Sequence, residues 1–104
     1  NISKYYAIKN INECIEYLNN KYLYENIYNI CLELLKHDIY NPIVIFGEID
    51  SKKLQSSMTL FDYTIENIRN LLDKKIVNIF KKVLDKYYYG QRDRLTLEIL
   101  EGTK

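Results

Sequence analysis

Apolar side chains recur every three or four residues along nearly the whole chain, and this spacing predicts α-helices. Between about Lys21 and Lys36 the apolar stripe is wide enough to be packed on two sides. Three glycines and one proline among 104 residues are too few for a turn-dense β architecture. The sequence therefore predicts an all-α fold, a single compact domain over residues 1–104 with about six helices and no sheet.

Residues with capping preferences mark where the expected helices begin. Asn10, Asp50 and Asp93 each precede an apolar-periodic stretch and have side chains that accept hydrogen bonds from the first helical N–H groups. The expected helical segments are residues 11–18, 21–36, 42–46, 50–61, 65–72, 74–88 and 93–100. Their inward positions predict a common core made of Leu18, Ile27, Cys31, Leu34, Leu54, Met58, Phe61, Phe80 and Leu84.

The segment from Pro42 to Phe46 is the one place where a strand competes with a helix. Its β-branched residues favour a strand. Asn41 as a cap, Pro42 at the first helical position and Gly47 just past the end favour a short helix instead. Because the sequence offers no second strand to pair with it, we expect the helix.

Charge and cysteine content bound the class of protein. With 15 Lys+Arg against 14 Asp+Glu, the chain has a net charge of +1, too small for a strong field towards nucleic acid or an anionic membrane. We find no apolar run near the ~20 residues of a membrane span and no export signal. Cys14 and Cys31 are too few for a disulfide framework or a zinc site, so we expect buried free thiols in a cytoplasmic protein without a metal or cofactor.

Basic and aromatic residues gather in the C-terminal third, where two interpretations compete. Tyr87-Tyr88-Tyr89 with Arg92 and Arg94 supplies the groups that stack on nucleic-acid bases. Tyrosine is abundant throughout the chain, however, and the net charge is small, so a nucleic-acid partner is not favoured. Five lysines with interspersed acids are typical of a solvated helix face: Lys74, Lys75, Lys81, Lys82 and Lys86.

The segment Lys53–Phe61 reads K-L-Q-S-S-M-T-L-F and resembles the K-x-x-S-S-M-T-L-F string of a family of small helical proteins. The resemblance extends from Tyr6 to about Leu100 and includes Ile45-Phe46-Gly47, Val83-Leu84-Asp85-Lys86-Tyr87 and Thr96-Leu97. The family is a domain of unknown function that is often labelled "calpastatin" in error. The resemblance implies a compact all-helical fold and no particular reaction.

Members of that family usually carry a segment rich in Trp, Phe, Pro and Gln ahead of the motif that here reads Tyr6-Ala7-Ile8. This chain has no Trp and opens close to that motif, so it resembles a member that lacks the segment. Apolar surface left without that cover should seek a second copy of the chain or a separately encoded N-terminal fragment. We expect self-association with Tyr5, Tyr6 and Ile43–Phe46 near the contact.

Four polar residues of the recognised segment are candidates for a binding site. On a helix that begins near Asp50, the side chains of Lys53, Ser56 and Ser57 share one face. An ammonium group and two hydroxyls near a helix N-terminus could hold a phosphate or carboxylate. The alternative is structural, with Asp50 as a cap, Lys53 solvated and the small serines allowing close helix packing.

Two functions from different classes therefore stay open. The first is a module that binds a small anionic molecule, such as a nucleotide or phosphorylated metabolite, at the helix Asp50–Phe61. The second is a helical protein-interaction module without catalytic activity. The single histidine, His37, lies at an expected helix end, so the sequence gives little support to nucleophilic catalysis and leaves open whether the protein is an enzyme.

Overall fold

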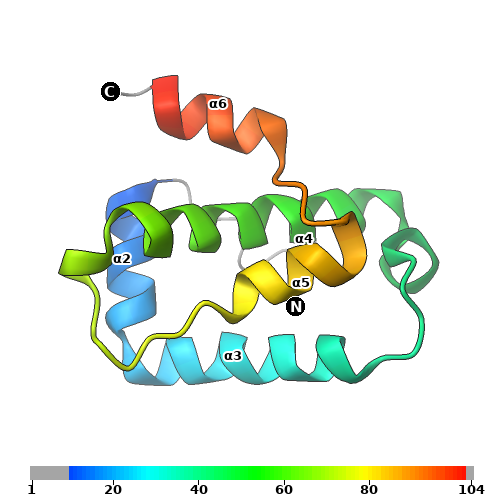
Figure 1. The fold of residues 1–104 in the computed structure, drawn as a ribbon, viewed down its shortest axis with the longest axis horizontal. Coiled ribbons are helices and arrows are strands. Elements are labelled where there is room, and N and C mark those ends of the chain that lie inside the picture. The colour runs from blue at the N-terminus through cyan, green and yellow to red at the C-terminus, as the bar shows by residue number, and fades with distance from the viewer. Residues whose placement is uncertain (1–9, 103–104) are drawn as a thin grey trace.

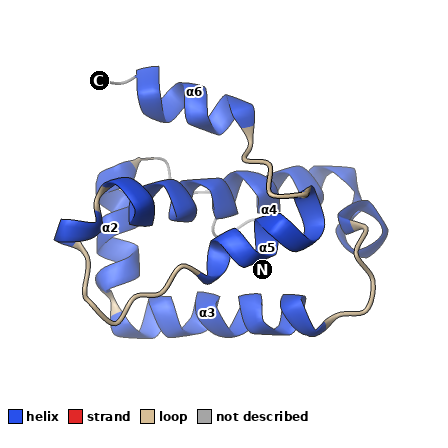
Figure 2. Ribbon diagram, in the orientation of Figure 1, coloured by secondary structure: helices blue, strands red, loops and turns tan. Residues whose placement is uncertain are grey.

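Helices account for all the regular structure in the computed structural model, which describes residues 10–102 (Figures 1 and 2). Within this range no residue is in a strand, and the all-α prediction is confirmed. The five α-helices described are close to the six expected. The elements are α2 (Ile11–Asn19), α3 (Lys21–Lys36), α4 (Pro42–Asn67), the 3₁₀ helix η1 (Arg69–Leu71), α5 (Ile79–Tyr88) and α6 (Arg94–Gly102).

Helix α4 is the element against which most of the others pack. Helix α5 lies between α3 and α4 and contacts both, while α2 packs against α3 and α4 at one end of the molecule (Figure 1). Helix α6 contacts α4 on the side opposite to α3. The longest helix is therefore covered on several faces by shorter ones.

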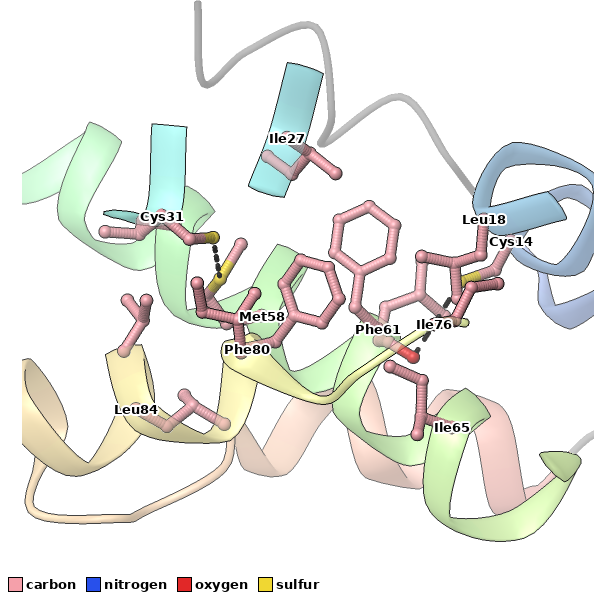
Figure 3. Packing of buried hydrophobic residues seen from close by; sticks show 14 of the residues in the cluster. Cys14, Leu18, Ile27, Cys31, Met58, Phe61, Ile65, Ile76, Phe80 and Leu84 are labelled. Carbon is pink, nitrogen blue, oxygen red and sulfur yellow. Dashed lines mark hydrogen bonds between the residues drawn. The ribbon is translucent and has the colours of Figure 1, made fainter. Parts of the chain in front are cut away.

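The core is centred on two stacked phenylalanines, Phe61 of α4 and Phe80 of α5, whose ring centroids are 4.6 Å apart (Figure 3). Tyr17 of α2 adds a third ring, 5.6 Å from that of Phe61. All nine residues that the helical spacing predicts to be inward are buried in this core. The period of three to four residues was thus sufficient to find buried positions on α2, α3, α4 and α5.

Both cysteines are free thiols buried in this core, as expected from their apolar surroundings. The Sγ atom of Cys31 lies 3.8 Å from the thioether sulfur of Met58 (Figure 3). Burial raises the pKa of Cys14 and of Cys31 from the ordinary value of 9.0 to about 12. Both sulfurs therefore stay protonated at neutral pH and act as small apolar side chains.

A glycine divides α4 into two parts. Gly47 has φ 82° and ψ 169°, a conformation that only glycine adopts without strain, and it separates the short helix Pro42–Phe46 from the long segment after it. The short helix begins as predicted, with the Asn41 side chain accepting from the backbone N–H of Ile43 at 2.9 Å.

The helix after Gly47 differs at both ends from the expected segment 50–61. Asp50 is already helical, so it lies in the first turn and is not the N-cap. The helix continues to Asn67 and takes in part of the separate segment expected over 65–72, of which only η1 stands apart. At Thr64 the buried hydroxyl is satisfied within the helix, since it donates to the Leu60 carbonyl one turn earlier at 2.8 Å.

Helix α5 begins later than the segment 74–88 predicted. The N-cap is Asn78, whose side chain accepts from a backbone N–H in the first turn. Ahead of it the chain is held out of a helix by Tyr24, whose hydroxyl accepts from the backbone N–H of Val77 at 3.0 Å. The spacing could not show this, because Tyr24 lies on another helix more than 50 residues earlier.

Lys86 lies away from the solvated face to which the charge pattern assigned it. Its ammonium group donates to the backbone oxygens of Leu34 at 2.8 Å and Leu35 at 3.1 Å, and also to that of His37. The same ammonium lies 4.9 Å from the centre of the Tyr40 ring. Lys86 therefore satisfies carbonyls at the end of α3, where positive charge complements the helix dipole.

Truncating either ring of the stacked pair should unfold much of the core. We expect Phe61→Ala and Phe80→Ala each to lower the free energy of unfolding by about 3–5 kcal/mol, because each leaves a cavity. The measurement is urea unfolding. The control, Leu95→Ala, alters a side chain that is 63% exposed and should cost no more than about 0.5 kcal/mol. Equal stability of all three variants would contradict the assigned core.

Raising the pH should destabilise the fold through the two thiols. The unfolded chain loses thiol protons near pH 9.0, whereas the folded chain keeps them up to about pH 12. Their contribution to stability is therefore complete below pH 9.0 and is lost as the pH rises towards 12. Urea unfolding across this range should show a smaller decline for the Cys14→Ala/Cys31→Ala double variant than for the native chain. An identical decline would show that the thiols do not titrate as described.

Candidate functional site

Three of the four candidate residues occupy one face of α4 just after the Gly47 kink. Asp50, Lys53 and Ser57 follow each other at intervals of three and four residues, so their side chains lie one above the other along the helix. Asp50 and Lys53 are half-buried, and Ser57 is only 3% exposed. The structure thus places a carboxylate, an ammonium group and a buried hydroxyl in one row.

The Ser57 hydroxyl is a buried polar group whose hydrogen bonding is not satisfied. Within residues 10–102, Ser57 Oγ is the one buried side-chain oxygen or nitrogen without a hydrogen-bond partner. The hydroxyl of Thr59, two residues later, donates to the carbonyl one turn earlier at 2.7 Å. A buried hydroxyl without a partner costs about 1–3 kcal/mol, so an unused group of this kind calls for an explanation.

Ser56 has a partner of its own on another helix. Its Oγ atom lies 2.6 Å from the Oγ1 atom of Thr96 on α6. Thr96 in turn donates to the Asp93 carboxylate, which accepts from the Thr96 backbone N–H at 3.0 Å and caps α6 as the sequence predicts. The Ser56 hydroxyl therefore helps to attach α6 to α4.

Further polar groups of α4 hold the connection between α5 and α6. The Thr59 hydroxyl accepts from the backbone N–H of Asp93 at 2.8 Å, and the Gln55 side chain donates to the backbone oxygen of Gln91 at 3.0 Å. We call these contacts, with the Ser56–Thr96 pair, the α4–α6 seam. The Ser and Thr of the recognised string therefore serve, in part, to attach the C-terminal helix.

Asp62 is the most buried charged group of this region, and the sequence analysis missed it. It is 2% exposed and accepts from Arg92 Nε at 2.7 Å and from the Asn78 side-chain amide at 2.7 Å. Since Asn78 is also the N-cap of α5, one carboxylate ties α4 to the start of α5 and to the loop before α6. The only signal in the sequence was its spacing, three residues after Thr59 and seven after Gln55.

The tyrosine cluster of the C-terminal third is mostly used inside the protein. Tyr87 is buried, and its hydroxyl donates to the Leu34 carbonyl at 2.6 Å. Burial raises the pKa of Tyr88 to about 12, and Arg92 pairs with Asp62. Of the rings in this run only that of Tyr89 is fully exposed, at 95%. The described cluster is thus built into the fold and does not form an open stacking platform.

Two hollows lie on a different part of the surface, between α3 and the chain leading into α5. Their volumes are about 320 and 290 Å³, and they share Tyr28 and Val77 in their walls. Neither is lined by Asp50, Lys53, Ser56 or Ser57. In residues 10–102 no three His, Cys, Asp or Glu side chains gather as metal ligands.

These features define a small all-α protein whose C-terminal helix is attached to a central helix by polar contacts. The chain belongs to the family described as Protein of unknown function (DUF1810), whose model matches residues 1–100. Neither the curated proteins nor the solved structures include a significant match to the chain. None of the helices described has the length and apolar character needed to cross a membrane. The family is described by no function, so neither membership of it nor the helical fold specifies a reaction.

Removing the Asp62 carboxylate should destabilise the protein strongly. Asp62→Ala leaves Arg92 without its acceptor and leaves the Asn78 amide only its longer contact with Glu66, at 3.3 Å. We expect a loss of about 3 kcal/mol in the free energy of unfolding. The matched control is Arg94→Ala, which breaks a pair with Glu98 whose side chains are 92% and 62% exposed. That surface pair should contribute less than about 1 kcal/mol. Equal losses in urea unfolding would show that Asp62 does not join the three segments.

Proposed function

We propose that this protein binds a small anionic molecule, of the nucleotide or phosphorylated-metabolite class, on the α4 face formed by Asp50, Lys53 and Ser57. The observation that supports the proposal best is the unsatisfied hydroxyl of Ser57, one helical turn from the ammonium group of Lys53. A ligand oxygen would give that hydroxyl the acceptor it lacks. The two serines of the string would then have separate roles, with Ser57 for the ligand and Ser56 for α6.

The chemistry of the row suits a phosphate or a carboxylate. Lys53 supplies positive charge and several donors, and Ser57 supplies a neutral donor on the same face. Gly47 begins a new helical segment, so its first N–H groups and the positive end of the helix dipole lie at the same end of the row. The carboxylate of Asp50 is an acceptor for neutral ligand groups such as sugar hydroxyls.

The proposal concerns binding, and it contains no chemical step. The residues that carry it hold charge and donate hydrogen bonds. We also place the protein in the cytoplasm, which its two free thiols support, because thiols stay reduced in that compartment.

Substituting the two serines separately should distinguish a binding role from a packing role. Ser57→Ala removes an unsatisfied buried hydroxyl, so the free protein should be as stable as the native chain or slightly more so. The same change should weaken ligand binding. Ser56→Ala is the matched control: it loses the Thr96 contact, costs about 1 kcal/mol in stability, and leaves binding unchanged.

The probes are ADP and inorganic phosphate, tested separately by isothermal titration calorimetry and by the shift in melting temperature. We expect ADP to bind the native chain, and Lys53→Gln and Ser57→Ala to weaken binding about tenfold or more. If inorganic phosphate also binds, and the same two substitutions weaken its binding, then the site recognises the anionic group and not the rest of the nucleotide. Absence of heat and of any shift with both probes would contradict the proposal, and so would equal binding by the Ser57 variant.

A second candidate function, protein interaction without catalytic activity, is favoured by a different observation. Within residues 10–102 twelve large apolar side chains are exposed, and five of them lie in the eleven residues from 39 to 49. An exposed apolar patch of this kind is typical of a surface that contacts another protein. The sequence suggested two partners for such a surface, a second copy of the chain or a complementing N-terminal fragment.

A further inference from the structure

The two hollows beside α3 lie outside the proposed anion site, and together they have the composition of a binding site. In Figure 1 the chain that leads from η1 into α5 (yellow) runs alongside α3 (cyan), and the hollows lie between these two segments. Both have Tyr28 and Val77 in their walls, so they adjoin each other. We call the two hollows together the α3 groove.

One wall of the α3 groove is a segment that side chains hold out of a helix. The Tyr24 hydroxyl accepts from the backbone N–H of Val77 at 3.0 Å and donates to the carbonyl oxygen of the same residue at 3.3 Å. Arg69 donates to the carbonyl oxygens of Lys74 and Ile76. This wall is therefore fixed before any ligand arrives, as in most small-molecule sites. A departure from the local helical pattern, such as this one, is expected at functional sites.

The first end of the groove carries two opposite charges on facing walls. Glu25 and Asn29 come from α3, and Lys75 comes from the segment opposite. Within residues 10–102 neither Glu25 nor Lys75 belongs to an ion pair, with each other or with another residue. The space between them is therefore open to a ligand that carries both an ammonium group and a carboxylate.

The second end of the groove is lined mainly by apolar side chains. Leu32 and Leu35 of α3 face Ile79 of α5 across a hollow of about 290 Å³, which exceeds the volume of a leucine or phenylalanine side chain. Lys82 is the one charged residue described in this lining, and it disfavours a cationic side chain in the hollow. This end therefore suits a large apolar side chain.

We infer that the α3 groove binds a free α-amino acid with a large apolar side chain. The ammonium group of the ligand would lie against Glu25, its carboxylate against Lys75, and its side chain among the apolar residues of the second end. A ligand with only negative charge would be repelled by Glu25, and one with only positive charge by Lys75 and Lys82. The inference is independent of the proposed anion site, because the two sites share no residue.

Titration of the isotope-labelled chain with L-phenylalanine to about 10 mM, followed by NMR chemical shifts, tests the inference. We expect saturable shifts at the backbone amides of Glu25, Asn29 and Val77, with a Kd of about 1 mM or lower. Two analogues each lack one charge of the amino acid: phenethylamine has no carboxylate, and 3-phenylpropionate has no ammonium group. Each analogue should bind at least about tenfold more weakly than L-phenylalanine.

Four variants locate the site on the protein. Glu25→Gln and Lys75→Gln should each weaken the binding of L-phenylalanine about tenfold, because each removes one charge partner. The matched controls are Glu33→Gln on α3 and Lys81→Gln on α5. Both change exposed residues that line neither hollow, so both should bind like the native chain.

Absence of saturable shifts with L-phenylalanine would overturn the inference, whether or not ADP binds at the anion site. Equal binding of the amino acid and its two analogues would also overturn it, because the charges would then have no role. Equal weakening by the two groove variants and their controls would contradict the assignment to the α3 groove. Lys53→Gln should bind L-phenylalanine like the native chain, and a loss of binding would contradict that assignment as well.

Discussion

The stacked rings of Phe61 and Phe80 join α4 to α5, and the positions of the remaining helices depend on that contact. Helices α2 and α6 have nine residues each and α5 has ten, lengths at which an isolated helix is marginal in water. Such helices are stabilised by the apolar face that they bury. The long helix α4 supplies a surface for all three, and α3 closes the other side of α5. The three short helices α2, α5 and α6 therefore become stable only when they pack on their longer neighbours.

Helical periodicity was enough to predict the class of fold and the buried faces of α2, α3, α4 and α5, because both depend on residues close together in the chain. The start of α5 and the role of Lys86 could not be predicted in this way. Each is decided by a partner on α3 some 50 residues away, the Tyr24 hydroxyl for α5 and the last carbonyls of α3 for Lys86. The charge pattern identified Lys86 as solvated because a periodic pattern shows which face a residue occupies and not what lies opposite.

In the candidate site too, local spacing predicted some features and long-range contacts decided others. Spacing alone put Lys53 and the two serines on one side of a helix that begins near Asp50. The structure keeps Lys53 and Ser57 in one row and adds Asp50 to it. Which serine already has a partner was decided by Thr96 on α6, forty residues later, and no spacing on α4 could reveal it. Asp62 was missed for a related reason, since its partners come from two other segments. Local sequence predicted which residues share a side of the helix, and a long-range contact decided that Ser56 has a partner on α6.

The capping of the C-terminal end of α3 by Lys86 affects the order in which the chain gains structure during synthesis. The carbonyls at the end of α3 leave the ribosome about fifty residues before the ammonium group that binds them. Protein synthesis adds roughly 5–20 residues per second. The last carbonyls of α3 therefore lack their partner, and the face that carries Cys31 stays unpacked, for several seconds. The first half of the chain thus has neither its core nor its cap until α5 is made. The protein should fold in one late cooperative step, and a nascent chain that stops before α5 should be a substrate for chaperones or proteases.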